Sequence, residues 1–245
     1  MKDLVKKLQG HTNHLLRFFS ELLERYAYLE PMFFQEEVIK SFNSVKEGRG
    51  FDVIRYSLFF DCIQDVAKMT MDEDKKKKRT PSIKNIMEGL SCQCARNMLR
   101  EEFAKTSSDI PEDADEAVKE SCKRIKNQVE AERYELFDST YKDLLNKWEG
   151  IKNNQQIKAF CIIRDRLTAH LQLNMVNGSY QFTDISTLGL QWGDLGDTLS
   201  DLKPIIQNLN LIINNGSSDI DDREAEFNKM ADKFWRKVTV KREGA

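Results

Sequence analysis

One segment of the chain combines an arginine and a histidine with a helical pattern of apolar residues. The segment is QIKAFCIIRDRLTAHLQL, residues 156–173. On a helix its apolar side chains form one continuous face, with Arg164 near the middle of that face and His170 at its edge. A guanidinium among apolar side chains costs free energy unless an anion compensates for it. The pattern therefore marks this helix as a candidate functional site.

Arg164 and His170 together are suited to cleaving RNA without a metal ion. A histidine titrates near neutral pH, so His170 can take a proton from a ribose 2′-OH or return one. An arginine is permanently charged and can bind two phosphate oxygens at once, so Arg164 can anchor the phosphate and stabilise its developing charge. This chemistry predicts a ribonuclease with His170 as general base or acid and Arg164 as phosphate anchor.

The spacing of these two residues requires a further element. Six residues separate them by about 120° around a helix and by about 9 Å along its axis, so one helix alone does not bring them together. Arg166 precedes His170 by four residues and lies nearer to it, which makes Arg166 a candidate RNA contact. Two copies of the helix that face each other across a two-fold axis can converge, and this predicts a homodimer.

A structural role for the same residues is an open alternative. Arg164 can be the buried partner of a carboxylate such as Asp61 or Asp65, with His170 an ordinary half-buried histidine. A separate alternative is a non-catalytic module that binds nucleotide, RNA or a partner protein through the same groove. In a third interpretation the protein is a purely structural dimer, and the charged residues form an ion cluster.

The elements that position this segment are predicted to be helices throughout. The 245 residues include only 11 Gly and 4 Pro, which is too little turn chemistry for a many-stranded sandwich or barrel. Apolar residues recur at helical spacing over most of the chain. The helices are expected at residues 3–28 (beginning as a loose turn, because Gly10 interrupts it), at a short segment restarted by Pro31, and, after a break at Gly48–Gly50, at 51–69, 82–105, 112–152, 155–173, 192–213 (bent or divided at Pro204) and 221–240.

The helix expected at 112–152 is unusually long. A helix of some 38 residues would measure about 57 Å, which exceeds the width of a compact domain. Its apolar residues follow near-heptad spacing, so its ends are expected to project or to pair with another chain. After the motif helix, Asn177-Gly178 between Val176 and Tyr180 is typical of a hairpin turn.

Composition excludes several classes of protein. The net charge of −2 and the pI of about 6.0 exclude a globally basic nucleic-acid binder, so RNA must meet a local patch. The basic run of residues 75–79 is flanked by acids and is expected to be a solvated loop, with RNA contact the minority interpretation. There is no metal or cofactor motif, so we expect neither. We expect a cytoplasmic protein that does not enter membranes, because no apolar run spans a bilayer, no signal peptide is evident, and the five cysteines fit a reducing compartment.

The motif helix resembles the signature of the HEPN superfamily, in which an Arg is followed by a polar residue and, a few residues later, by a His. The stretch IIRDRLTAHLQL looks like the abortive-infection U-type branch of that superfamily. Two other stretches, in the same order as in that branch, are similar to it: RYSLFFDCIQDVAKMTMDED with TPSIKNIMEGL, and LQWGDLGDTLSDLKPIIQNLNLII. The resemblance covers roughly residues 10–215.

The resemblance implies an all-α fold, a HEPN-like helical bundle with long antiparallel helices that often dimerises through the motif helices. Many members are metal-independent endoribonucleases of phage defence or toxin–antitoxin systems, and others bind nucleotides or RNA without cutting. By position Arg164 matches the motif Arg, Asp165 the polar residue, where Asn is commoner in active members, and His170 the motif His. RNA, a second copy of the chain and an antitoxin protein are the implied partners.

The chain is expected to divide into two parts. Residues 1–215 form the HEPN-like helical domain, and residues 216–245 form a linker and a C-terminal amphipathic helix. The apolar stripe of that last helix predicts that it either packs on the core or serves as a dimer arm.

Overall fold

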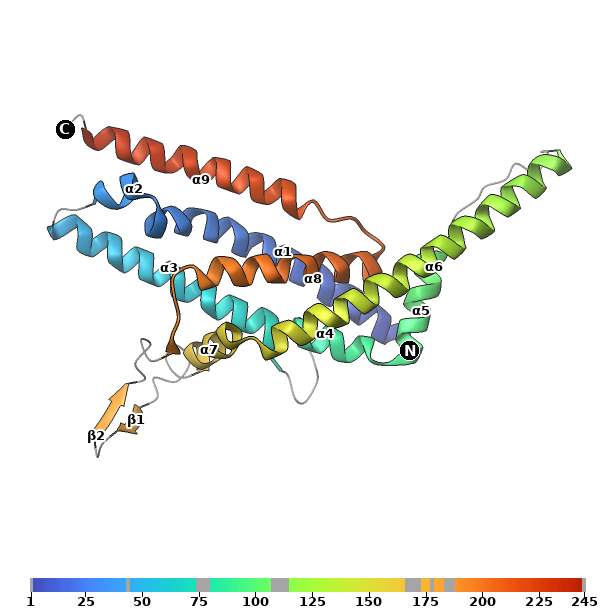
Figure 1. Cartoon of the computed structure of the whole chain (residues 1–245), viewed down its shortest axis with the longest axis horizontal. Coiled ribbons are helices and arrows are strands. Elements are labelled where there is room, and N and C mark those ends of the chain that lie inside the picture. The colour runs from blue at the N-terminus through green and yellow to red at the C-terminus, as the bar shows by residue number, and fades with distance from the viewer. Residues whose placement is uncertain are drawn as a thin grey trace.

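Runs of sequence with helical apolar spacing form helices in the computed structural model, which describes residues 2–42, 45–73, 80–106, 115–165, 173–176, 179–182 and 188–243 (Figure 1). The helices are α1 (Lys2–Phe34), α2 (Glu36–Lys40), α3 (Val45–Met71), α4 (Ile83–Leu90), α5 (Gln93–Ala104), α6 (Glu116–Asn153), α7 (Gln155–Ile163), α8 (Asp194–Asn214) and α9 (Ile220–Glu243). The all-α class is confirmed.

One antiparallel hairpin is added to the helices. Strand β1 (Leu173–Val176) pairs with β2 (Ser179–Phe182), with Leu173 opposite Phe182 and Val176 opposite Ser179. The two strands flank the expected turn, as predicted. The prediction of a helix through Leu173 is wrong at its last residue, because Leu173 pairs as a strand.

Helix α1 lies at the centre of the bundle. It contacts α3 and α8, which run antiparallel to it, and α9, which runs parallel to it (Figure 1). Its side chains Leu15, Phe19 and Leu22 are almost completely buried. The core also takes Ile63 from α3 and Leu202 from α8, both fully buried. This arrangement confirms the prediction of long antiparallel helices.

Two expected helix breaks are absent from α1. The helix continues through Gly10 and through Pro31, although we expected a loose turn at the first and a new helix at the second. Pro31 is itself buried, and a short interruption comes later, at Gln35. The apolar stripe on both sides of each residue packs on the same core, and this packing outweighs the low helix propensity of Gly and Pro.

Two other helix boundaries also differ from the prediction. Helix α3 already includes Gly48–Gly50, where we expected a break. The single helix expected at 82–105 is divided into α4 and α5 at Ser91 and Cys92. Helix α8, by contrast, continues through Pro204. No described helix is both long and apolar enough to span a bilayer.

Helix α6 has 38 residues, as predicted. Its C-terminal part packs on the bundle with Phe137, Leu144 and Trp148 buried. Its N-terminal part extends away from the other helices (Figure 1). Helix α9 packs on the core, which is one of the two arrangements predicted for it. The indole Nε1 of Trp235 donates a hydrogen bond of 3.1 Å to the carbonyl of Tyr28 in α1.

Two helical glycines offer a matched test of this packing. A Cβ at Gly196 of α8 would clash with the hydroxyl of Tyr26, whereas a Cβ at Gly10 of α1 would meet nothing within 4 Å. Gly196→Ala should lower the free energy of unfolding by about 1–2 kcal/mol. Gly10→Ala should raise it by up to about 1 kcal/mol, because alanine favours helix. Urea unfolding measures both, and equal shifts for the two variants would contradict the close approach of α1 and α8.

Candidate functional site

The candidate site lies at the end of α7. The side chain of Asn154 caps the start of this helix by accepting hydrogen bonds from the backbone N–H groups of Gln156 (2.7 Å) and Ile157 (3.2 Å). The apolar face that the sequence predicted is buried against α3 and the rest of the core, with Ile157, Phe160 and Ile163 fully covered. After Ile163 the chain continues in one wide helical turn through Arg164 and Asp165.

The Arg164 side chain is mostly removed from water, with 17% of its surface exposed. Its Nε donates to Oδ1 of Asp165 at 2.7 Å. Its Nη1 donates to the carbonyl of Ala67 at 3.3 Å and to Oδ1 of Asp72 at 3.2 Å. The guanidinium thus joins the end of α7 to the last turn of α3, as expected for a cation set against an apolar face.

The predicted acid partners of Arg164 are wrong. Asp65 instead accepts from Arg25 at 2.6 Å and from Lys68 at 3.2 Å, one turn or more before the end of α3. Among the described residues, the carboxylates that bind Arg164 belong to Asp72, just beyond α3, and to its own neighbour in sequence, Asp165. Both reach solvent, with 39% and 58% of their side chains exposed. Within the described ranges, the acids that bind Arg164 therefore lie at the surface of the bundle.

Asp72 is held in place by the start of α4. Its carbonyl accepts hydrogen bonds from the hydroxyl of Ser82 (2.7 Å) and from Nδ2 of Asn85 (3.1 Å). Nδ2 of Asn85 also donates to the carbonyl of Thr80 at 2.9 Å. Ser82 additionally caps α4 by accepting from the backbone of Asn85. These bonds fix both ends of the connection between α3 and α4.

A second ion pair lies beside the first. Lys84 of α4 binds Glu73, the residue after Asp72. We define the Arg164 cluster as Arg164, Asp165, Asp72, Glu73 and Lys84. With three acids and two bases, the cluster carries a net negative charge at neutral pH.

The charges of the cluster affect its titration. Burial lowers the pKa of Arg164, but its hydrogen bond to Asp165 and the charge of Asp72 outweigh that effect, so the pKa is raised. Burial also raises the pKa of the nearby Cys161 thiol, with Asp165 and Asp72 adding to the rise. Arg164 thus remains charged, and Cys161 remains a protonated thiol at neutral pH.

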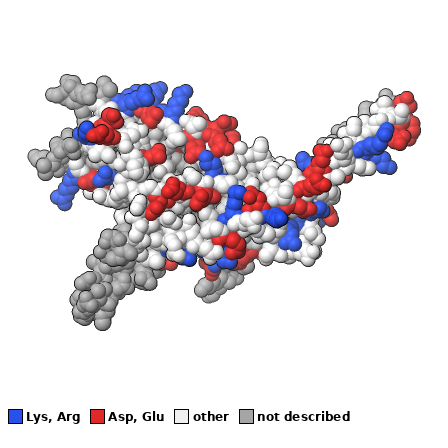
Figure 2. Space-filling view, viewed as in Figure 1, with Lys and Arg blue, Asp and Glu red and all other residues white. Residues whose placement is uncertain are grey.

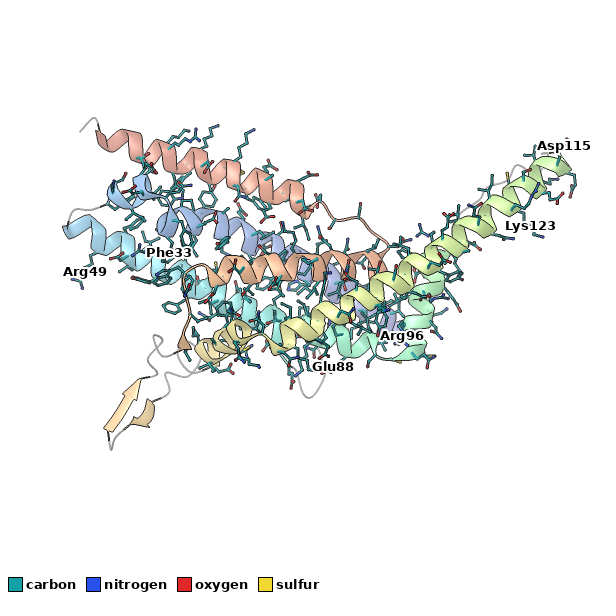
Figure 3. The ribbon with its side chains drawn as sticks, viewed as in Figure 1. Phe33, Arg49, Glu88, Arg96, Asp115 and Lys123 are labelled. Atoms are coloured by element: carbon teal, nitrogen blue, oxygen red, sulfur yellow. The ribbon has the colours of Figure 1, made fainter. Side chains whose placement is uncertain are left out.

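A cavity of about 310 Å³ adjoins the cluster between α4 and α6. Lys84 lines it and is shared with the cluster. Tyr141, Trp148 and Lys152 of α6 form the opposite wall, and Glu88 of α4, labelled in Figure 3, completes it. The cavity offers two aromatic side chains and two ammonium groups within one pocket, a composition typical of sites for small polar aromatic ligands.

Part of the predicted site lies outside the described residues. His170 and Arg166 fall in 166–172, and the basic run falls in 74–79. Of the sequence-predicted residues, the structure therefore brings Arg164 and Asp165 together at the end of α7. Over the described ranges, no group of three or more His, Cys, Asp and Glu is arranged to hold a metal ion.

Sequence reasoning did not find four residues of the site. These residues lie on or beside α3 and α4, and their roles depend on how those helices dock on α7: Asp72, Glu73, Lys84 and Asn85. One signal was present: Pro81 followed by Ser82 marks the start of a helix, and a capped helix start orders the residues before it.

The structure is an all-α bundle in which the helix that carries Arg164 ends at the surface. Residues 5–234 match the HEPN_AbiU2 family, described as AbiU2, and the chain belongs to this family. The match covers almost the whole chain and extends into α9. Comparisons with curated proteins and with solved structures found no match.

Arg164 should contribute measurably to stability because it links α3 to α7. Arg164→Ala removes hydrogen bonds to two carboxylates and one carbonyl, and we expect the free energy of unfolding to fall by about 1–2 kcal/mol. Arg17, with 72% of its side chain exposed and paired with Glu21 on α1, provides the control. Arg17→Ala should change stability by less than about 0.5 kcal/mol. Chemical denaturation compares the two variants, and equal losses would refute the link.

Proposed function

We propose that this protein is a metal-independent endoribonuclease of the HEPN type, with Arg164 as the phosphate anchor and His170 as the general base or acid. The observation that carries this proposal is the position of Arg164. The guanidinium is held at the surface end of the motif helix by carboxylates that themselves reach solvent. A phosphate oxygen can replace a solvent-accessible carboxylate without opening the core. Membership of the AbiU2 family supports the same function.

The chemistry follows from the two side chains. His170 takes the proton of a ribose 2′-OH, whose oxygen attacks the adjacent phosphorus while the bond from phosphorus to the 5′ oxygen breaks. The products are a 2′,3′-cyclic phosphate and a 5′ hydroxyl, which receives a proton from an imidazolium. Arg164 stabilises the negative charge that builds on the phosphate oxygens during this step. Arg166 is proposed to contact the RNA beside this site.

A homodimer is part of this proposal. Arg164 and His170 are six residues apart, and one chain does not place them against a single phosphate if the motif stays helical. Two chains related by a two-fold axis can supply Arg164 from one copy and His170 from the other. We propose a cytoplasmic role in phage defence or in a toxin–antitoxin system, with an antitoxin protein as the natural inhibitor.

We propose that Asp165 competes with phosphate for Arg164. Its Oδ1 accepts a hydrogen bond of 2.7 Å from Nε of Arg164, and its negative charge repels an incoming phosphate. RNA must therefore displace it, and we infer that the bound carboxylate holds the resting enzyme at low activity.

A non-catalytic module is the second candidate function. It is favoured by the way in which two carboxylates and a carbonyl surround Arg164. In that case the Arg164 cluster and its cavity bind nucleotide or RNA without turnover, or support a protein contact.

Cleavage of a labelled single-stranded RNA in EDTA tests the catalytic proposal. The wild-type protein should cut the RNA, and His170→Ala should cut it at least about 100-fold more slowly. Arg164→Ala should lose about 100- to 1000-fold, because charge stabilisation at the phosphate disappears. His14→Ala is the matched control, since His14 is an exposed histidine on α1, and it should retain full activity.

The outcomes of this experiment separate the two candidates. Absence of cleavage by the wild-type protein, or equal cleavage by His170→Ala, would end the ribonuclease proposal. Tight RNA binding without turnover that is lost in Arg164→Ala would establish the binding module instead.

Asp165→Asn should strengthen RNA binding. The amide keeps a hydrogen-bond acceptor beside Arg164 but removes the competing charge, so we expect the Kd for RNA to fall by about threefold to tenfold. Asp219→Asn is a close control, because Asp219 is also 58% exposed and binds an arginine Nε, that of Arg223, at 2.8 Å. Fluorescence anisotropy with a labelled RNA measures both. Weaker binding by Asp165→Asn would show that the carboxylate helps to form the site.

A further inference from the structure

The N-terminal part of α6 forms a second feature that the proposed ribonuclease does not use. We call residues 116–132 the α6 arm. At 1.5 Å per residue the arm is about 25 Å long, and it extends beyond the other helices (Figure 1). No residue of the arm is buried, and the first buried residue of α6 is Phe137. The arm is therefore a helix whose fold does not depend on burial in its own bundle.

The arm presents an apolar stripe at heptad spacing. Val118, Cys122, Ile125 and Val129 follow one another at intervals of four, three and four residues, which are the a and d positions of a coiled coil. Val118 and Ile125 are 49% and 61% exposed, and the other two are partly exposed. We call these four residues the α6 seam. Glu132 continues the spacing with a charge and so ends the seam.

The two edges of the seam differ in charge. Lys119 and Lys126 lie about 100° and about 80° from Val118 on one side of the helix. Ser121 and Gln128 occupy the corresponding places on the other side. Lys126 has only a long contact of 3.9 Å with Glu130. The arm as a whole carries both signs of charge, as Figure 2 shows, but the edge that would flank a partner helix is basic.

The arm is attached firmly to the bundle at its base. Arg133 donates from Nε to the carbonyl of Phe103 at 2.6 Å and from Nη2 to Oδ1 of Asn215 at 2.6 Å. Its guanidinium also stacks over the Phe103 ring at 4.7 Å. Arg100 of α5 and Asp138 of α6 form a bidentate pair one turn further on. The seam is thus presented at a fixed angle, which reduces the entropy lost when a partner binds.

An antiparallel second copy of the chain fits this seam poorly. In the antiparallel register that sets Val118 against Val129 and Cys122 against Ile125, Lys119 of each copy lies beside Lys126 of the other. Two like-charge contacts of this kind disfavour the pair, because residues that flank a coiled-coil seam decide which partner is accepted.

We propose that the α6 arm is a docking site for an amphipathic helix of another protein, with apolar residues at its own a and d positions and acidic residues beside them. The apolar face of the partner covers the α6 seam, and its carboxylates meet Lys119 and Lys126. This docking site shares no residue with the Arg164 cluster.

A pair of synthetic peptides tests the proposal with the full-length chain. Each peptide has three heptads with Ile at a and Leu at d, and carries either Glu or Lys at both e and g. In fluorescence anisotropy the acidic peptide should bind at least about tenfold more tightly than the basic one, a difference of about 1.4 kcal/mol. Ile125→Asp should weaken binding of the acidic peptide by at least about tenfold, or about 1.4 kcal/mol. Lys126→Glu should reduce the ratio of the affinities for the acidic and the basic peptide.

The control variant is Asn127→Asp, which adds the same charge on the opposite face of the arm, about 180° from the seam. Figure 3 marks the end of the arm at Asp115 and its outer turns at Lys123. Asn127→Asp should bind the acidic peptide within about twofold of the wild-type chain, allowing for screening at ~0.1 M salt. Both substitutions lie on the unburied arm, so circular dichroism should show full helicity in each.

Three results would overturn the proposal. The first is equal affinity of the chain for the two peptides, or no binding of either. The second is equal binding of the acidic peptide by wild type and Ile125→Asp. The third is a wild-type dimer in sedimentation that Ile125→Asp dissociates and Asn127→Asp does not, since a second copy would then cover the seam.

Discussion

The structure around the motif helix depends on neutralising the positive charge of the Arg164 guanidinium. The apolar face of α7 must pack on α3, and this packing takes Arg164 out of most of its contact with water. A charge in that position requires anions. The end of α3 and the start of α4 supply them, because Ser82 and Asn85 fix the backbone of Asp72 where its carboxylate reaches Arg164. The junction of three helices is thus organised around one cation.

The same compensation sets the chemical character of the site. The carboxylates of Asp72 and Asp165 satisfy the arginine, and they also compete with any phosphate that approaches it. In the proposed function, RNA would displace these carboxylates because its several phosphates together carry more charge than a single carboxylate. The adjoining cavity, with Tyr141 and Trp148 in its lining, lies next to these residues. The proposed function thus assigns phosphate binding and resistance to phosphate binding to neighbouring residues of one cluster.

Much of the fold could be predicted from the sequence, and the failures have physical causes. The apolar stripes gave the all-α class and the length of α6, and the wheel of residues 156–173 gave the half-buried position of Arg164. Gly10, Pro31 and Gly48 were predicted to interrupt helices, but packing on a shared core outweighs local propensity at each of them. Asp72 was not identified because it lies 92 residues from Arg164 in the sequence. No local sequence pattern indicates that folding brings these two residues into contact. Asp61 and Asp65, the predicted partners, lie on α3 like Ala67, whose carbonyl accepts from Arg164, but they precede Ala67 in the helix.

Helix α6 joins two distant surfaces of the protein, the arm and the cavity. One unbroken helix carries Val118 on the arm and Trp148 in the wall of the cavity, about 45 Å apart at 1.5 Å per residue. A continuous α-helix is stiff over this length, and its support at Arg133 and Asp138 lies between the two. The contacts of Arg133 and Asp138 therefore act as a pivot for the helix. A sideways force on the arm must either bend the helix or tilt the cavity wall, so the arm and the cavity are mechanically coupled.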